Sequence, residues 1–161
     1  FHNEDALVGY RTIVIELSEQ VPDTIDVFCA GVGTGGLLAG ASRAFRDRDP
    51  APRIVALEPA SSPVLSEGQT GRHRIEGVGV GFVPPLLRAS DYDEVRTVDE
   101  ADARETARRM AREEGIFAGT SSGMNVAAAI RLARELGPGH TVATVAVDSG
   151  LKYLQGDLYQ A

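Results

Sequence analysis

The residues from Gly31 to Gly36 (GVGTGG) are the strongest candidates for chemistry in this sequence. They follow a short apolar segment, precede a helical pattern, and include four glycines among six residues. Backbone N–H groups in such a turn can converge on an anion, and the helix N-terminus adds positive potential. A tight turn whose glycines serve packing alone is the alternative, but this density of glycine favours an anion site.

The local spacing does not decide which phosphate this turn would bind. The segment also satisfies the pattern G-x-G-x-x-G, and Glu58 ends the next predicted strand about 20 residues on, as a dinucleotide-binding fold requires. Local spacing alone therefore favours NAD as much as any other phosphate ligand.

Three further segments have residues suited to ligand binding. In Gly119–Gly123 (GTSSG), Ser121 or Ser122 is suited either to capping the following helix or to contacting a ligand. Glu76–Phe82 (EGVGVGF) alternates glycine, which is typical of a loop that approaches a ligand or moves, with a purely structural loop as an even alternative. Asp148–Gly150 follows an apolar strand, and ligands of open α/β sheets lie at that edge.

Other kinds of chemistry find little support. The single cysteine, Cys29, excludes an internal disulfide and a cysteine-rich zinc site, and its apolar strand favours a core role. His2, His73 and His140 lack partners at helical spacing, so we expect no metal site. Lys152 is the sole lysine, so covalent lysine chemistry must use it or a residue outside this chain.

Composition sets the class of protein. The chain has 161 residues, a formal net charge of −7 and 43% hydrophobic residues, which indicates one globular domain spanning residues 1–161. The acidic balance disfavours nucleic-acid and anionic membrane partners. No apolar run approaches about 18 residues, and no signal-peptide pattern follows Phe1. We therefore expect a cytoplasmic protein or a piece of a longer one.

Strand and helix patterns alternate with short turns, which predicts an α/β domain with a mainly parallel sheet. The predicted strands are 24–30, 53–57, 94–98 and 141–147, with a brief one at 116–118. The predicted helices are 6–20, 37–47, 99–114 and 124–136, with a short one at 63–67 in a long loop. Pro22 ends the first helix, and Asp99 is the expected N-cap of the third, with Asp102 as its capping-box partner.

Taken together, the motifs resemble the second half of the cysteine synthase and cystathionine β-synthase family, which are pyridoxal-phosphate enzymes of fold type II. The segments that carry the resemblance, in the family's order, are Phe1-x-Asn3, 30–36 (AGVGTGG), 55–59 (VALEP), 75–84 (IEGVGVGFVP), 113–115 (EEG), 119–123 and 148–154 (DSGLKYL). Their order, rather than local spacing, decides against NAD. The resemblance implies the large-domain part of the tryptophan synthase β-like fold, a three-layer sandwich.

The resemblance also implies pyridoxal 5′-phosphate as cofactor and assigns roles to residues. The cofactor phosphate would be held by Gly33, Thr34, Gly35 and Gly36, with Leu37 at a position where the family commonly has threonine. Ser121 would face the pyridine nitrogen, and a neutral hydroxyl there makes the ring a weaker electron sink, which suits β-elimination. The substrate pocket would be bordered by Gly77, Val78 and Gly79, and Asp148–Gly150 would line the ring end.

The main departure from the family pattern concerns the catalytic lysine. In the family, this lysine and the loop that binds the substrate carboxylate lie in the first half, and Lys152 matches a different basic position. The resemblance therefore implies no catalytic residue here, and a C-terminal fragment that is inactive alone.

The parent activity that we expect is cysteine biosynthesis from an activated serine, O-acetylserine, and sulfide, by a homodimer when full length. Cystathionine β-synthase or another β-replacement or elimination enzyme is the alternative within the class. A nucleotide- or NAD-binding Rossmann module that uses Glu58 is the alternative from another class.

Overall fold

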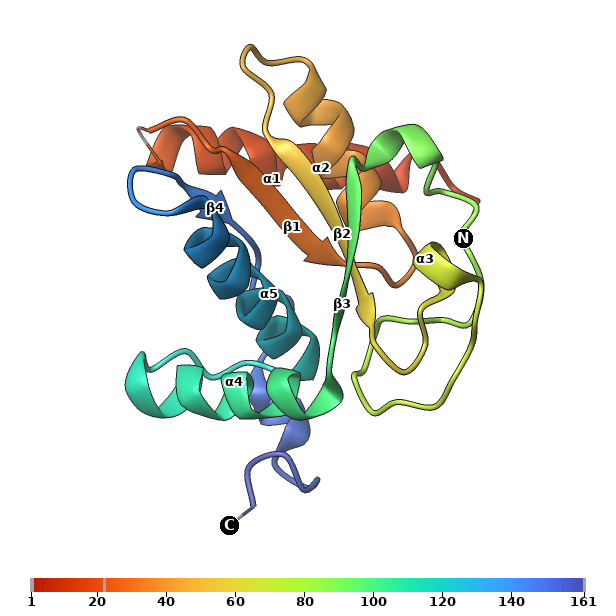
Figure 1. The fold of residues 1–161 in the computed structure, drawn as a ribbon, viewed down its shortest axis with the longest axis vertical. Helices are drawn as coiled ribbons and strands as arrows, with labels where there is room; N and C mark the ends of the chain where they lie inside the picture. Colours follow the sequence, from red (N-terminus) through yellow and green to blue (C-terminus); the bar gives the residue numbers. More distant parts are fainter. Residues whose placement is uncertain (1, 22, 161) are drawn as a thin grey trace.

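The computed structural model describes residues 2–21 and 23–160, and the predictions at Phe1 and Pro22 lie outside these residues. Its strands are β1 (Val27–Gly31), β2 (Arg53–Pro59), β3 (Glu94–Val98) and β4 (Val142–Ala143). They form one parallel sheet in the order β3-β2-β1-β4 (Figure 1). The predicted α/β class with a parallel sheet is confirmed.

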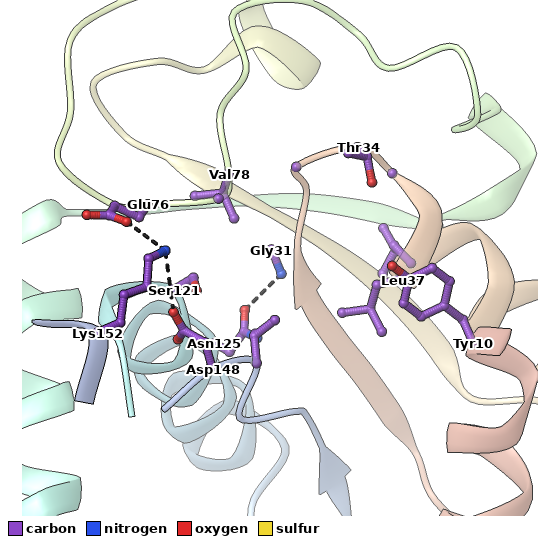
Figure 2. Close-up of a pocket in the computed structure, with 15 residues that line it drawn as sticks. Tyr10, Gly31, Thr34, Leu37, Glu76, Val78, Ser121, Asn125, Asp148 and Lys152 are labelled. Atoms are coloured by element: carbon purple, nitrogen blue, oxygen red, sulfur yellow. Dashed lines mark hydrogen bonds and ion pairs between the residues drawn. The ribbon is translucent and has the colours of Figure 1, made fainter. Parts of the chain in front are cut away.

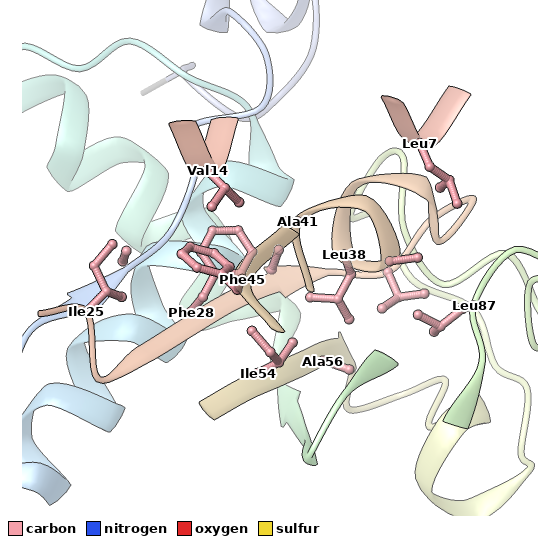
Figure 3. Packing of buried hydrophobic residues seen from close by; sticks show 14 residues of the cluster. Leu7, Val14, Ile25, Phe28, Leu38, Ala41, Phe45, Ile54, Ala56 and Leu87 are labelled. Carbon is pink, nitrogen blue, oxygen red and sulfur yellow. The ribbon is translucent and has the colours of Figure 1, made fainter. Parts of the chain in front are cut away.

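Helices cover both faces of this sheet. The helices are α1 (Ala6–Gln20), α2 (Gly36–Arg46), α3 (Val64–Glu67), α4 (Glu100–Glu113) and α5 (Thr120–Leu136), with short 3-10 helices at Ala89–Asp91 and Gly150–Tyr153. Side chains alternate along β1, so that Phe28 packs with α1 and α2 and Cys29 packs with α5 on the other face. Figure 3 shows the first of these clusters, in which the rings of Phe28 and Phe45 lie 5.2 Å apart. The three-layer sandwich is therefore confirmed.

The strand order places a topological switch point beside β1. The chain runs outward from β1 to β2 and β3, and it then returns to β4 on the opposite side of β1. Ligands of open α/β sheets lie at the carboxyl ends of strands at such a point, where the two directions of winding leave a crevice. The turn that follows β1 is the glycine-rich segment Gly31–Gly36, so the topology alone directs attention to it.

Three strands differ from their predicted bounds, and the smallest difference is that β2 continues to Pro59 instead of ending at Leu57. The first begins at Val27 rather than Thr24, and the last pairs only at Val142–Ala143 instead of over 141–147. β4 lies at one edge of the sheet, so residues 144–147 could pair only with β1. Instead, the Thr144 hydroxyl donates to the carbonyl of Cys29, and side chains of α5 bond the backbone groups of Val145 and Val147. Hydrophobic alternation could not reveal this, because it reports burial rather than the presence of a partner strand.

Helix starts also differ from prediction. Asp99 precedes α4, but its side chain makes no capping hydrogen bond, so the predicted capping box with Asp102 is wrong. α5 begins at Thr120, which puts Ser121 and Ser122 inside the first turn, where neither acts as the cap. The brief strand predicted at 116–118 is reduced to a single bridge at Ala118. None of the helices within the described residues has the length and apolar character to cross a membrane.

Candidate cofactor site

A cavity of about 200 Å³ lies at the switch point (Figure 2). The predicted site residues that line it are Gly33, Thr34, Gly35, Leu37, Gly77, Val78, Ser121 and Asp148. Their segment neighbours Gly36, Gly79, Ser149 and Gly150 do not line the cavity. Four segments that are far apart in the sequence therefore meet at one place.

The glycine turn leaves the start of α2 open to an anion. Gly35 is the residue before the helix, and its φ of 82° is a left-handed conformation that glycine adopts without strain. No side chain of the described residues caps this end of α2, and its first turn has no acidic residue. The first N–H groups of a helix lack partners inside it, so a phosphate here would satisfy them and meet the positive end of the helix dipole. The residues present therefore fit a phosphate group.

The second glycine segment lies directly against the first. A β-carbon added at Gly33 would be 2.0 Å from the carbonyl oxygen of Gly77, so these two backbones touch. The N–H of Gly79 donates to the carbonyl of Val32 at 3.0 Å, and the N–H of Glu76 donates to the Thr120 hydroxyl at 3.1 Å. The loop that contains Gly77 is thus held both to the glycine turn and to the start of α5.

The first turn of α5 forms another wall of the cavity. Ser121 lines the cavity, whereas the Ser122 hydroxyl accepts a hydrogen bond from the N–H of Val147 at 2.9 Å. Asn125, one turn further along, is fully buried and lines the cavity as well. Sequence reasoning missed Asn125. The available signal was an amide side chain four residues after Ser121 on the buried side of a helix otherwise rich in alanine.

Charged side chains lie at the other end of the cavity. The ammonium of Lys152 is 2.8 Å from a carboxylate oxygen of Glu76 and 4.0 Å from Asp148 (Figure 2). The Glu76 carboxylate raises the pKa of Lys152, so this amine stays protonated at neutral pH. Burial, together with a hydrogen bond to Asp148, raises the pKa of Tyr153. Glu76 is the first residue of the predicted segment Glu76–Phe82, but the sequence did not indicate that its carboxylate would pair with Lys152.

Glu58, the residue on which an NAD site would depend, is engaged elsewhere. Its carboxylate is buried and accepts hydrogen bonds from the N–H of Leu65 at 2.7 Å and from the N–H and hydroxyl of Ser66 at 3.1 and 2.6 Å. Glu58 thus binds the first turn of α3, and these hydrogen bonds occupy the carboxylate that a ribose would need. The described residues include no cluster of histidine, cysteine and carboxylate side chains that could hold a metal.

The fold and the site together define an α/β domain with an uncapped helix N-terminus and a cavity at its switch point, where a phosphate-bearing cofactor fits. The family model for pyridoxal-phosphate dependent enzymes matches residues 1–148. The chain belongs to this family, in the group of cysteine synthase and cystathionine β-synthase, and the cofactor of the family is pyridoxal phosphate.

Individual relatives support the same placement. A cysteine synthase of Staphylococcus aureus is 49% identical over 136 residues, which are 84% of this chain and 44% of that protein. The crystal structure of an O-ureido-L-serine synthase superposes with a TM-score of 0.93 at 37% identity, over 99% of this chain and 51% of that one. An O-acetylserine sulfhydrylase of Entamoeba histolytica gives 0.92 at 31% identity, over 99% and 48%. The chain thus spans about half the length of these relatives.

Proposed function

We propose that this chain supplies the phosphate and ring-nitrogen contacts of a pyridoxal-phosphate enzyme that converts O-acetylserine and sulfide to cysteine. The observation that carries the proposal is the meeting of the open glycine turn, Ser121 and the Gly77 loop in one cavity. The 49% identity to a cysteine synthase supports the choice of substrates. Cystathionine synthesis is the second candidate, because an O-acetylserine-dependent cystathionine β-synthase of Helicobacter pylori superposes with a TM-score of 0.90 at 33% identity.

The glycine turn would bind the phosphate. The N–H groups from Gly33 to Gly36 and the hydroxyl of Thr34 would donate hydrogen bonds to its oxygens, and the N-terminus of α2 would offset its negative charge. Leu37 has no hydroxyl to add, so this site would hold the phosphate with one donor fewer than a threonine there would give.

Ser121 would donate its hydroxyl hydrogen to the pyridine nitrogen. When bound, pyridoxal phosphate supplies an electron sink for negative charge at the substrate α-carbon. A neutral hydroxyl does not stabilise a protonated ring nitrogen as a carboxylate would, so Ser121 would keep that sink weak. A weak electron sink suits loss of a substituent from the β-carbon, because the leaving group would take up the negative charge from the α-carbon.

On the substrate side, Gly77, Val78 and Gly79 would border the amino acid with backbone groups. Lys152 would remain a charged side chain paired with Glu76, since its raised pKa keeps the amine protonated and therefore not nucleophilic. The lysine that anchors the cofactor would thus come from residues outside this chain, and this chain would be inactive alone. Assembly of the parent enzyme as a cytoplasmic homodimer remains a prediction.

Two measurements test the proposal. Titration with pyridoxal phosphate, followed by absorbance, is expected to show saturable binding that weakens in Gly35→Ala and Ser121→Ala, whereas NAD is expected not to bind. An assay with O-acetylserine and sulfide is expected to give no cysteine from the 161-residue chain by itself. Turnover by this chain alone would overturn the assignment of the anchoring lysine, and NAD binding that is lost in Glu58→Gln would overturn the cofactor assignment.

A further inference from the structure

The second turn of α5 contains a buried polar side chain for which the cofactor contacts give no role. Asn125 is completely shielded from solvent, and both ends of its amide are bonded. Its Oδ1 accepts from the N–H of Gly31 at 2.8 Å (Figure 2). Its Nδ2 donates to the carbonyl oxygen of Val145 at 2.9 Å. Removing either bond would leave a buried backbone group unsatisfied.

These two partners belong to opposite sides of the switch point. Gly31 is the last residue of β1 and leads directly into the phosphate turn, whereas Val145 follows β4 and leads to the wall that contains Val147. β1 and β4 pair only at two positions, the last being Phe28 with Ala143. Beyond that point, the Thr144 hydroxyl donates to the carbonyl of Cys29 at 2.7 Å, and the Asn125 amide bridges the two backbones between Gly31 and Val145.

Asn125 also fixes where α5 lies relative to the glycine turn. It is four residues after Ser121, so the two side chains share one face of the helix. The hydrogen bond to Gly31 therefore ties the helix that presents Ser121 to the segment that presents the phosphate-binding N–H groups. A change at Asn125 would alter the separation between those two binding points without removing either of them.

We propose that Asn125 is a positioning residue that sets the distance between the phosphate turn and Ser121, so that one ligand engages both ends at once. This inference rests on the proposed function, because it takes the two ends to be those of a pyridoxine-type cofactor. If Asn125 only filled the core, its substitution would lower the affinity for every ligand in parallel with the loss of stability. Substitution of a positioning residue should lower the affinity for a ligand that contacts both the glycine turn and Ser121 far more than the affinity for a ligand that contacts the glycine turn alone.

The test compares two ligands by isothermal titration. Pyridoxine 5′-phosphate has a phosphate and a ring nitrogen but no aldehyde, so it cannot react with Lys152, and inorganic phosphate has only the first end. In Asn125→Ala, we expect the affinity for pyridoxine phosphate to fall about tenfold, the worth of a well-placed hydrogen bond, and the affinity for inorganic phosphate to change about twofold or less. Leu132→Val, in the same helix but away from the cavity, should lower the melting temperature without changing the ratio of the two affinities.

A second variant covers the case in which Asn125→Ala does not fold. Asn125→Asp keeps an acceptor for the N–H of Gly31 but has no donor for Val145, and any repulsion by its charge acts on both ligands, so the ratio of affinities remains the readout. In the double variant with Ser121→Ala, we expect Asn125→Ala to add little further loss of pyridoxine phosphate binding, since Asn125 acts through Ser121.

The outcomes separate this inference from the proposed function. If the unaltered chain binds pyridoxine phosphate no more tightly than inorganic phosphate, the cofactor site itself is refuted and the inference falls with it. If the unaltered chain binds pyridoxine phosphate tightly but the Asn125 variants lose both ligands equally, lose neither, or show losses additive with Ser121→Ala, the positioning role alone is overturned.

Discussion

Gly35 shows how one residue type serves both the fold and the site. Its left-handed backbone starts α2, and a β-carbon there would come within 3.0 Å of the Leu87 side chain and 3.3 Å of Pro84. Glycine therefore lets the turn expose the first N–H groups of α2 to a ligand while the far side of the turn packs closely. Such a residue is visible in the sequence, because few residue types other than glycine tolerate this geometry.

Gly35→Ala is expected to weaken pyridoxal phosphate binding at least about tenfold and to lower stability by about 1 kcal/mol, because alanine is strained at positive φ. Gly68→Ala is the matched control, since Gly68 also has positive φ (69°) but nothing lies within 4 Å of an added β-carbon. The control has the backbone strain without the close contacts to Leu87 and Pro84, so it should lose less stability than Gly35→Ala and keep its affinity for the cofactor. Urea unfolding and cofactor titration measure the two effects, and equal loss of affinity in both variants would refute a specific role for Gly35.

At the scale of elements, sequence patterns found those whose signal is local. Ala6–Gln20 and Glu94–Val98 were predicted to the residue, because helical periodicity in one and a β-branched run in the other mark both ends. The length of β4 and the start of α5 differ from prediction. Both depend on tertiary contacts, namely which strand lies beside β4 and which backbone group bonds Ser122. The site divides in the same way. Its glycine segments are visible in the sequence, whereas the role of Asn125 and the pairing of Glu76 with Lys152 depend on tertiary contacts.

One long-range ion pair joins two elements and gives a pH-dependent prediction. Arg43 of α2 donates two hydrogen bonds of 3.0 Å to the buried carboxylate of Asp91. Burial alone would raise the pKa of Asp91, but the bonds from Arg43 and from the N–H of Arg88 outweigh burial and lower the pKa below its ordinary value. The stability from this pair is therefore present above about pH 4 and is lost as the pH falls through the lowered pKa.

Arg43→Met should cost about 3 kcal/mol at pH 7, because it leaves a buried carboxylate without its partner. The difference from the unaltered chain should shrink as the pH falls to about 3, where Asp91 in the variant takes up a proton. Arg46→Met, in the same helix, breaks an exposed pair with Asp93 and should cost under about 1 kcal/mol. Urea unfolding at both pH values provides the measurement, and a difference that does not depend on pH would contradict this explanation.

At the scale of the whole molecule, the side of the sheet beyond β4 is open. A groove of about 410 Å³ lies between α1 and residues 145–147, and its apolar lining includes Ile13, Leu17, Leu37 and Val147. Val147 is 53% exposed, and the backbone beside it has no neighbouring strand among the described residues. If this chain is part of a longer enzyme, as proposed above, we expect the other residues of that enzyme to cover this apolar edge.

The isolated chain is expected to self-associate through this groove, because exposed apolar surface beside an open strand edge favours association. Val147→Lys should shift it toward the monomer, whereas Ile130→Lys, which adds the same charge at an exposed site on α5, should not. Sedimentation velocity at several concentrations measures the effect. A monodisperse monomer of the unaltered chain that melts cooperatively would contradict the open-edge interpretation.

The most direct test of the account is a ¹H–¹⁵N NMR titration of the labelled chain with pyridoxal phosphate. The account predicts that the backbone amides from Gly33 to Gly36 shift first and saturate together with that of Ser121, because the phosphate binds at the start of α2 and the ring reaches α5. Saturable shifts confined to other parts of the chain, with the Gly33–Gly36 amides unmoved, would contradict it.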